Sequence, residues 1–298
     1  MSNKILDKLK ADYLDTPIPN ELDFVVRKAI KQGRIKMKRK NTIKKTVAAA
    51  ATIAVLTVGI TAGVNANPVF AENLSKVPVV GGIVNVLKFK ELELDENGYH
   101  ANIDVPKIDG LDNKELENSL NEKYLEENTK LYNQFMSDME ELEKMGGGHL
   151  GVDSGYVIKT DNDEILSIGR YVVNTVGSSS TVFKYDTIDK KNQVLITLPS
   201  LFKDDSYIEI ISKNIKEQMI ENNKLDKNKV YWVEGIQEEP FELFEAIAET
   251  QNFYINEDGN LVISFDKYEV APGYMGVLEF VIPTEIISDI LVGGAYIK

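Results

Sequence analysis

Residues 46–66, TVAAAATIAVLTVGITAGVNA, decide the architecture of this chain because none of these 21 side chains is charged. As an α-helix, 21 residues reach about 31 Å, and the hydrocarbon core of a bilayer is about 30 Å thick. Ten Lys and Arg residues, with no Asp or Glu among them, lie immediately before this stretch in residues 27–45. Because basic flanks stay in the cytoplasm, the sequence predicts a single-pass membrane protein with its N-terminus inside and most of the chain outside.

The charge of the chain divides at the same place. Residues 1–45 hold 13 basic and 5 acidic side chains, a net charge of +8, whereas residues 46–298 hold 21 basic and 42 acidic ones, a net charge of −21. An acidic exterior repels nucleic acid and attracts cationic partners, with the fastest association at low salt. Acidity also keeps a protein soluble, so the charge fits either a cationic partner or solubility alone, and it argues against nucleic acid as a ligand outside the cell.

The apolar stretch has a second interpretation as a secretory signal peptide. Small residues occupy the positions that signal peptidase reads before two alanines, Ala66 and Ala71. A leader that begins with 45 further residues would be unusually long, however. The stretch is also a weak anchor, because Ala, Thr and Gly dilute its Val, Ile and Leu. We therefore predict a transmembrane helix at residues 46–66 with a signal-peptidase-like site at Ala66 or Ala71.

The basic head, residues 1–45, contains an amphipathic helix pattern. Asn20 is a favoured N-cap and Gly33 ends the pattern. The apolar positions between them follow helical spacing and are Leu22, Val25, Val26, Ala29 and Ile30. So short a head has no core that buries this stripe, which predicts docking in a groove of another protein. The alternative is a helix that lies on anionic lipid beside the basic residues.

The remainder of the chain predicts a juxtamembrane linker at residues 67–87, rich in Pro and Gly, and an extracellular α+β domain at residues 88–298. Near-helical spacing of apolar residues predicts a long helix at 113–144, a medium one at about 204–222 and a short one from Pro240. Antiparallel strands are expected to pack on the long and medium helices. The expected strands are 91–94, 99–105, 156–160, 164–175, 180–186, 193–197, 253–255, 261–265 and 275–282.

The sequence offers few groups for catalysis. It has no cysteine and only two histidines, His100 and His149, neither in a motif. Two acidic turns, 161–164 and 256–259, lack the alternating oxygen ligands of a calcium loop. We expect no enzyme activity, no metal and no cofactor. An anchored hydrolase stays an alternative, because paired carboxylates come together only in three dimensions.

One segment has the composition of a recognition loop. Residues 266–276, DKYEVAPGYMG, connect two expected strands and place Pro272, Tyr274 and Met275 at a turn. Rigid aromatic and adaptable thioether groups at a loop tip are typical of protein recognition. The alternative is that the tyrosines only cover the core of the sheet. A turn of small residues, Ser178, Ser179, Ser180 and Thr181, is expected to adjoin this loop.

Several of these segments resemble one family. Residues 268–276 (YEVAPGYMG), 279–283 (EFVIP) and 198–202 (LPSLF) look like the extracellular domain of anti-sigma factors of the RsiV type. The head, with IPNELD at 18–23 and VRKAI at 26–30, is similar to the cytoplasmic start of that family, and NPVFAE at 67–72 resembles membrane anti-sigma factors.

The resemblance implies a signalling role. The head would hold an extracytoplasmic-function sigma factor inactive at the membrane, and the exterior would bind lysozyme as receptor and inhibitor. The implied lysozyme contacts are Ser178, Ser179, Ser180, Thr181, Pro272, Tyr274 and Met275. Signal peptidase and then an intramembrane protease would release the sigma factor. The alternative function is a membrane-anchored module that binds peptidoglycan and has no cytoplasmic partner.

Overall fold

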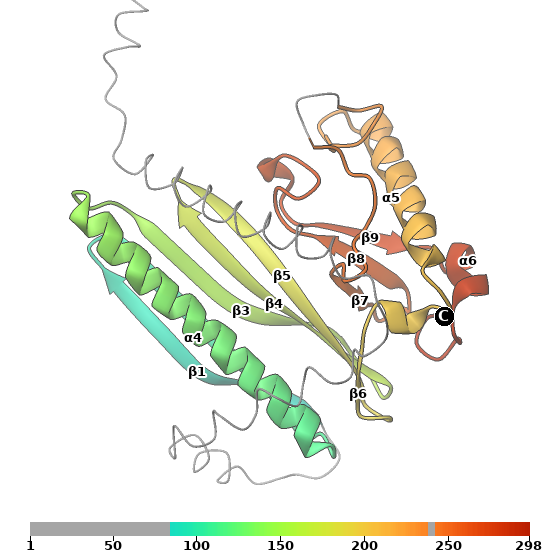
Figure 1. Cartoon of the computed structure of the whole chain (residues 1–298), viewed down its shortest axis with the longest axis horizontal. Helices are drawn as coiled ribbons and strands as arrows, with labels where there is room; N and C mark the ends of the chain where they lie inside the picture. The colour runs from blue at the N-terminus through green and yellow to red at the C-terminus, as the bar shows by residue number, and fades with distance from the viewer. Residues whose placement is uncertain (1–83, 238–241) are drawn as a thin grey trace, which may run out of the picture.

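The computed structural model describes residues 84–237 and 242–298, which form two sheets, each covered by a helix (Figure 1). The predicted head, transmembrane helix and most of the predicted linker lie outside these residues. Within the described part of the chain, no helix is long and apolar enough to cross a membrane. The described residues confirm an α+β domain made largely of antiparallel strands.

The larger sheet has six strands in chain order along the sheet. They are β1 (Asn85–Glu96), β2 (Tyr99–Asp109), β3 (Leu150–Asp161), β4 (Ile165–Val176), β5 (Ser178–Asp189) and β6 (Val194–Ile196). The first hairpin turns at Asn97 and Gly98, whose φ angles of 50° and 89° are those of a type I′ turn, which an Asn-Gly pair between two expected strands favours. The first strand begins three residues before the expected start of the domain at 88.

One strand pair of this sheet corrects the prediction. β2 and β3 are parallel, with Tyr99 opposite Leu150, whereas all strands were expected to be antiparallel. The helix α4 (Lys114–Lys144) connects them and carries the chain back along the sheet, which is how a parallel pair is normally joined. β3 also starts at Leu150, six residues earlier than expected.

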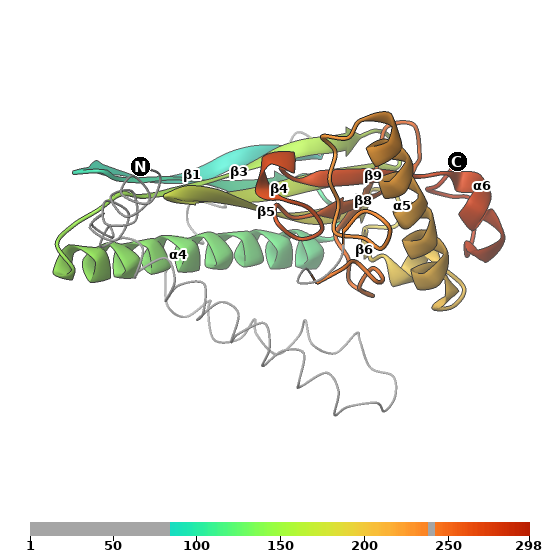
Figure 2. The ribbon, with the colours of Figure 1, turned by 90° about the horizontal axis from the view of Figure 1, so that it is seen from above.

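Helix α4 lies along one face of the six-stranded sheet (Figures 1 and 2). The Asn113 side chain caps its first turn by accepting a hydrogen bond from the N–H of Leu116 at 3.1 Å. Its apolar residues Leu120, Tyr124, Phe135 and Leu142, which follow the helical spacing, are buried against the strands. The helix ends where Gly146 and Gly147, both with positive φ, donate to carbonyls of its last turn, so the predicted boundary is confirmed.

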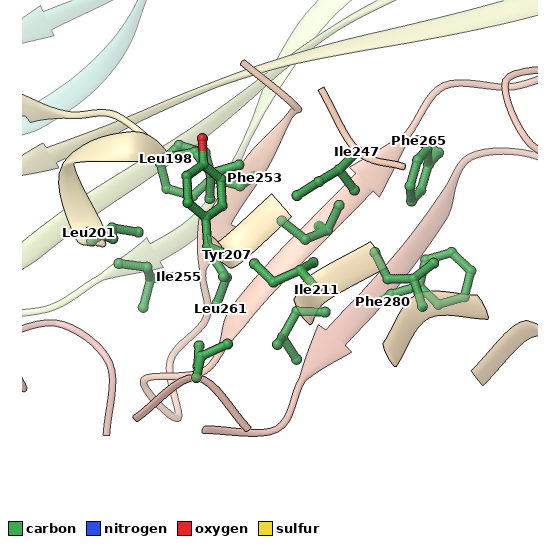
Figure 3. Packing of buried hydrophobic residues seen from close by; sticks show 14 of the residues in the cluster. Leu198, Leu201, Tyr207, Ile211, Ile247, Phe253, Ile255, Leu261, Phe265 and Phe280 are labelled. Carbon is green, nitrogen blue, oxygen red and sulfur yellow. The ribbon is translucent and has the colours of Figure 1, made fainter. Parts of the chain in front are cut away.

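The smaller sheet has three antiparallel strands, β7 (Phe253–Ile255), β8 (Leu261–Phe265) and β9 (Leu278–Ile282). Helix α5 (Ser206–Leu225) covers one of its faces, and Figure 3 shows Tyr207 and Ile211 of α5 packed among Phe253, Leu261 and Phe280. The short helix α6 (Thr284–Ile287) follows β9. This is the largest apolar core of the described residues.

Two expectations for this half are wrong. No helix forms at residues 242–248, which run as irregular chain because Phe244 donates its N–H to the carbonyl of Trp232 at 2.7 Å instead of to a helical neighbour. The last strand starts at Leu278 and not at Met275, because a 3₁₀ turn, η2 (Gly273–Met275), precedes it.

A buried ionic network attaches α4 to the larger sheet. Arg170 on β4 donates from Nε and Nη2 to Oδ2 of Asp186 on β5, at 3.1 and 3.0 Å. Its Nη1 donates to Glu127 on α4 at 2.6 Å, and Lys123 on α4 donates to Asp186 at 2.9 Å. The Arg170 guanidinium carbon also lies 4.3 Å from the ring centroid of Tyr124. Burial opposes ionisation of Asp186, but Arg170 and Lys123 outweigh it and lower the pKa of its carboxyl.

We expect Asp186→Asn to lower the free energy of unfolding by about 3–5 kcal/mol, because it leaves Arg170 buried without its main counter-charge. Since the pKa of Asp186 is lower in the folded than in the unfolded chain, its contribution is present above pH 4 and is lost as the pH falls below that value. Urea unfolding between pH 7 and pH 3 measures both effects.

The matched control is Glu126→Gln, which removes an exposed α4 ion pair with Lys130 and should cost less than about 0.5 kcal/mol. Equal losses in the two variants, or an unchanged acid dependence in Asp186→Asn, would contradict the assigned role of the network.

Candidate functional site

The loop 266–276 is attached to the edge of β5 at its first residues. The Asp266 carboxylate accepts the N–H of Phe183 at 2.7 Å, and the Lys267 N–H donates to the carbonyl of Thr181 at 3.1 Å. Asp266 and Glu269 also close the root of the loop, because Glu269 accepts the N–H of Asp266 at 2.7 Å. A segment that follows β8 is therefore held against a strand of the other sheet.

Side chains extend this attachment to the serines of β5. Lys267 Nζ donates to Ser179 Oγ at 2.8 Å, and the hydroxyls of Ser178 and Tyr268 lie 3.1 Å apart. The sequence predicted that the serine segment adjoins the loop, and the structure brings the two together over about 90 positions of sequence. The segment is not a turn, however, since the β4–β5 hairpin turns at Gly177 with φ 68° and Ser178 already pairs with Val176.

The three loop residues singled out from the sequence differ in exposure. Tyr274 is 67% exposed, and its hydroxyl donates to the carbonyl of Asn228 at 2.8 Å, which holds the ring at the surface. Pro272 is half-buried and begins the η2 turn. Met275 is also half-buried and packs against the core beneath α5. We call Ser178–Thr181 together with residues 266–276 the docking face, and Tyr274 is its most exposed aromatic group.

An acidic segment, described at residues 228–237 and 242–249, lies beside the docking face and was not recognised as part of it from the sequence. Trp232 donates its N–H to the carbonyl of Val270 at 2.8 Å, which places the segment next to the loop. Six glutamates and no Lys or Arg occupy positions 234–249. The glutamates Glu234, Glu242, Glu245 and Glu249 are exposed. The docking face therefore has a strongly negative neighbour, which favours a cationic partner.

A second polar cluster lies where the two sheets meet. Glu279 on β9 accepts from Lys159 at 2.7 Å, from Tyr254 at 2.9 Å and from Tyr185 at 3.0 Å. Burial opposes its ionisation, but the bonds from Lys159 and Tyr254 outweigh it and lower the pKa of the Glu279 carboxyl. Burial raises the pKa of both tyrosines. A carboxylate kept ionised and engaged by three donors joins the sheets and is unsuited to general acid catalysis.

The described residues contain no group of three or more His, Asp or Glu side chains placed to hold a metal ion. His100 lies on β2, with Nε2 3.6 Å from Asp153, and both side chains are about half exposed. His149 packs against the turn at Gly98. The predicted sigma-binding stripe, Leu22, Val25, Val26, Ala29 and Ile30, and the predicted cleavage positions Ala66 and Ala71 lie outside the described residues.

Comparisons with known proteins cover both halves of the chain. A family described as a protein of unknown function, DUF3298, matches residues 199–285, which include α5, the smaller sheet and the loop 266–276. A domain of unknown function, DUF4179, matches residues 38–153. The chain is 47% identical over 296 residues to the anti-sigma-V factor RsiV of Bacillus subtilis (strain 168), across 99% of this chain and 100% of that protein.

Two solved structures are similar to the described fold. A DUF3298 family protein from Pseudomonas aeruginosa PAO1 has a TM-score of 0.50 at 13% identity, over 74% of this chain and 98% of that one. A member of the same family from Bacteroides fragilis NCTC 9343 has a TM-score of 0.49 at 15% identity, over 71% of this chain and 95% of that one. At such identity the first likeness supports a shared fold alone.

Proposed function

Since this chain belongs to the family of RsiV-type anti-sigma factors, we propose that it sequesters an extracytoplasmic-function sigma factor at the cell membrane and senses lysozyme outside the cell. The observation that carries the proposal is the 47% identity along the whole length of both chains, which includes the head, the apolar stretch and the exterior domain. The name of the relative, an anti-sigma factor, implies that a sigma factor is the partner and that this chain is a regulator and not an enzyme.

The cytoplasmic part of the proposal rests on the head. Its apolar stripe has helical spacing, stands in a segment too short to bury it and precedes a basic run that favours a cytoplasmic location. A helix in a groove of the sigma factor would cover Leu22, Val25, Val26, Ala29 and Ile30. The chain would then cross the membrane once at residues 46–66.

The extracellular part of the proposal rests on the docking face. It combines an exposed aromatic anchor, Tyr274, with small hydroxyl side chains on β5 and a neighbouring segment whose described residues include four exposed glutamates. Lysozyme is a cationic protein, so an exposed aromatic anchor with an acidic segment beside it suits lysozyme in charge and in contact chemistry. Binding there would lead to cleavage by signal peptidase at Ala66 or Ala71, and an intramembrane protease would then free the sigma factor.

The head is tested by Val25→Asp together with Val26→Asp. Two carboxylates on the apolar stripe should prevent docking, because burying them without partners is costly. We expect transcription that depends on the sigma factor to rise without any stimulus. Lys31→Asp, on the opposite face of the expected helix, is the control and should leave repression intact. Unchanged repression in the double variant would refute the stripe as the sigma-binding surface.

The extracellular partner is tested with the full-length chain and purified lysozyme over a salt series. Replacing Glu234, Glu245 and Glu249 by Gln should lower the association rate about tenfold at low salt and flatten the salt dependence of that rate. The reason is that the acidic segment attracts a cationic partner over a distance. Surface plasmon resonance measures the rate.

The matched control for this experiment replaces Glu93, Glu115 and Glu126 by Gln. It changes the net charge equally, but on β1 and α4. Equal effects of the two triple variants would remove the docking face from the proposal. Absence of binding by the unaltered chain at low salt would remove lysozyme as the ligand and leave the anti-sigma function standing.

The dependence of cleavage on lysozyme is tested by sequencing the new N-terminus of the protein after cells are exposed to lysozyme. We expect fragments that begin at Asn67 or Glu72 only after exposure, because the cut would follow Ala66 or Ala71. The same fragments in unexposed cells would indicate an ordinary leader that is removed at secretion.

A further inference from the structure

Tyr268 has an unusual backbone for its residue type. Its φ of 69° lies in the left-handed region, which only two other non-glycine residues of the described chain, Asn97 and Gln193, also adopt. Asn tolerates this region, whereas a tyrosine there is strained and persists only where its surroundings fix it. Strain of this kind is often found in segments that present a binding surface.

Contacts on both sides fix the Tyr268 side chain. Its hydroxyl lies 3.1 Å from Ser178 Oγ, and Lys267 Nζ lies 5.3 Å from the centroid of its ring. The preceding residues are held to β5 through their backbone, as described for Asp266 and Lys267. The Tyr268 ring therefore spans from the serines of β5 to the far limb of the loop.

On that far limb the ring fills the place of a side chain at Gly273. A Cβ atom added to Gly273 would lie 2.1 Å from Cζ and 2.2 Å from Cε1 of Tyr268. The φ of Gly273 is outside the left-handed region, so its backbone would accept alanine. The Tyr268 ring is what requires glycine here, and Gly273 lies between Pro272 and Tyr274.

We propose that Tyr268 is a positioning residue of the docking face: its ring against Gly273 and its hydroxyl against Ser178 hold the η2 turn so that Tyr274 is presented to the partner. The inference rests on the proposed lysozyme function and adds to it, because Tyr268 acts through Tyr274 and not as a principal contact. A loop that is already held in its binding conformation loses less conformational entropy when it binds its partner.

The first test is hydrogen–deuterium exchange on the free, full-length chain. Tyr268→Gly keeps the left-handed backbone accessible and removes the ring and the hydroxyl. We expect exchange at Met275 and Gly276, which donate to Pro272 and Gly273, to become about tenfold faster. The Lys267 amide, bonded to Thr181, should keep its protection. Unchanged exchange at Met275 and Gly276 would overturn the inference.

The second test is a double-mutant cycle on lysozyme affinity. Tyr268→Gly and Gly273→Ala should each weaken binding about tenfold, and the double variant should bind no more weakly than Tyr268→Gly, because without the ring the added methyl group has nothing to displace. Losses that add in full would show that the ring contact is not the cause, and would overturn the inference. Tyr274→Ala serves as the reference for loss of the proposed anchor itself.

The thermal stability of the variant shows whether Tyr268 positions the loop or only supports the fold. Tyr268→Gly relieves the strained backbone, so its thermal midpoint should be unchanged or higher while its affinity falls. A lower midpoint with a parallel loss of affinity would mark a merely structural residue. Gln193→Gly, at another positive φ far from the loop, is the control and should leave affinity unchanged.

The two proposals fail in different ways. If the unaltered chain does not bind lysozyme but exchange at Met275 and Gly276 rises in Tyr268→Gly, the ligand is wrong and the positioning role stands. If lysozyme binds and neither exchange nor affinity responds to Tyr268→Gly, the ligand stands and the positioning role is overturned.

Discussion

The seam between the two sheets is the constraint on which the rest of this structure depends. β3 and β5 meet the smaller sheet through polar groups: Thr160 Oγ1 donates to the carbonyl of Ile255 at 2.5 Å, and Asn252 donates to the carbonyl of Phe183 at 2.9 Å. Tyr185 and Tyr254 stack across the same seam with centroids 5.2 Å apart. Because these bonds are directional and wholly or partly buried, they fix the relative position of the sheets more sharply than apolar packing would. The loop after β8 is thereby brought to β5, and the docking face exists only because of this alignment.

Local periodicity in the sequence predicted much of the fold, and long-range contacts account for what it missed. The 3.6-residue spacing of α4 and the Asn97-Gly98 turn are local signals, and both elements form where expected. The parallel pairing of β2 with β3 depends on how α4 returns the chain, and alternation of residues within a strand does not encode it. The irregular segment around Phe244 was mistaken for a helix because its apolar residues have helical spacing, while tertiary bonds to Trp232 determine its course.

For the docking face, too, the sequence indicated the local features and missed those that depend on long-range contacts. Composition alone indicated Tyr274 and Pro272 as a recognition loop and suggested the serines of β5 as neighbours, and the structure joins them. The acidic segment was missed, because the glutamates at positions 234–249 have no spacing in the sequence that marks them as one surface. Tertiary hydrogen bonds, from Trp232 to Val270 and from Tyr274 to Asn228, show that this charge lies beside the loop. The role of Tyr268 was invisible for a similar reason, since neither its φ angle nor its contact with Gly273 can be deduced from residue type.

Two ionic clusters, one buried at Arg170 and Asp186 and one partly exposed at Lys159 and Glu279, explain why the docking face can be strained without loosening the domain. Arg170 and Asp186 tie α4 to the larger sheet, and Lys159 and Glu279 tie the smaller sheet to it, so both layers are fixed independently of the loop. Removing one charge from the buried pair of Arg170 and Asp186 is costly, because the other charge is left buried without a partner. The loop 266–276 lies between these fixed bodies and holds its own strain at Tyr268, where a partner can use a rigid surface. In the proposed function, lysozyme held on this face would act on the predicted linker at residues 67–87, which joins the domain to the expected membrane-spanning stretch.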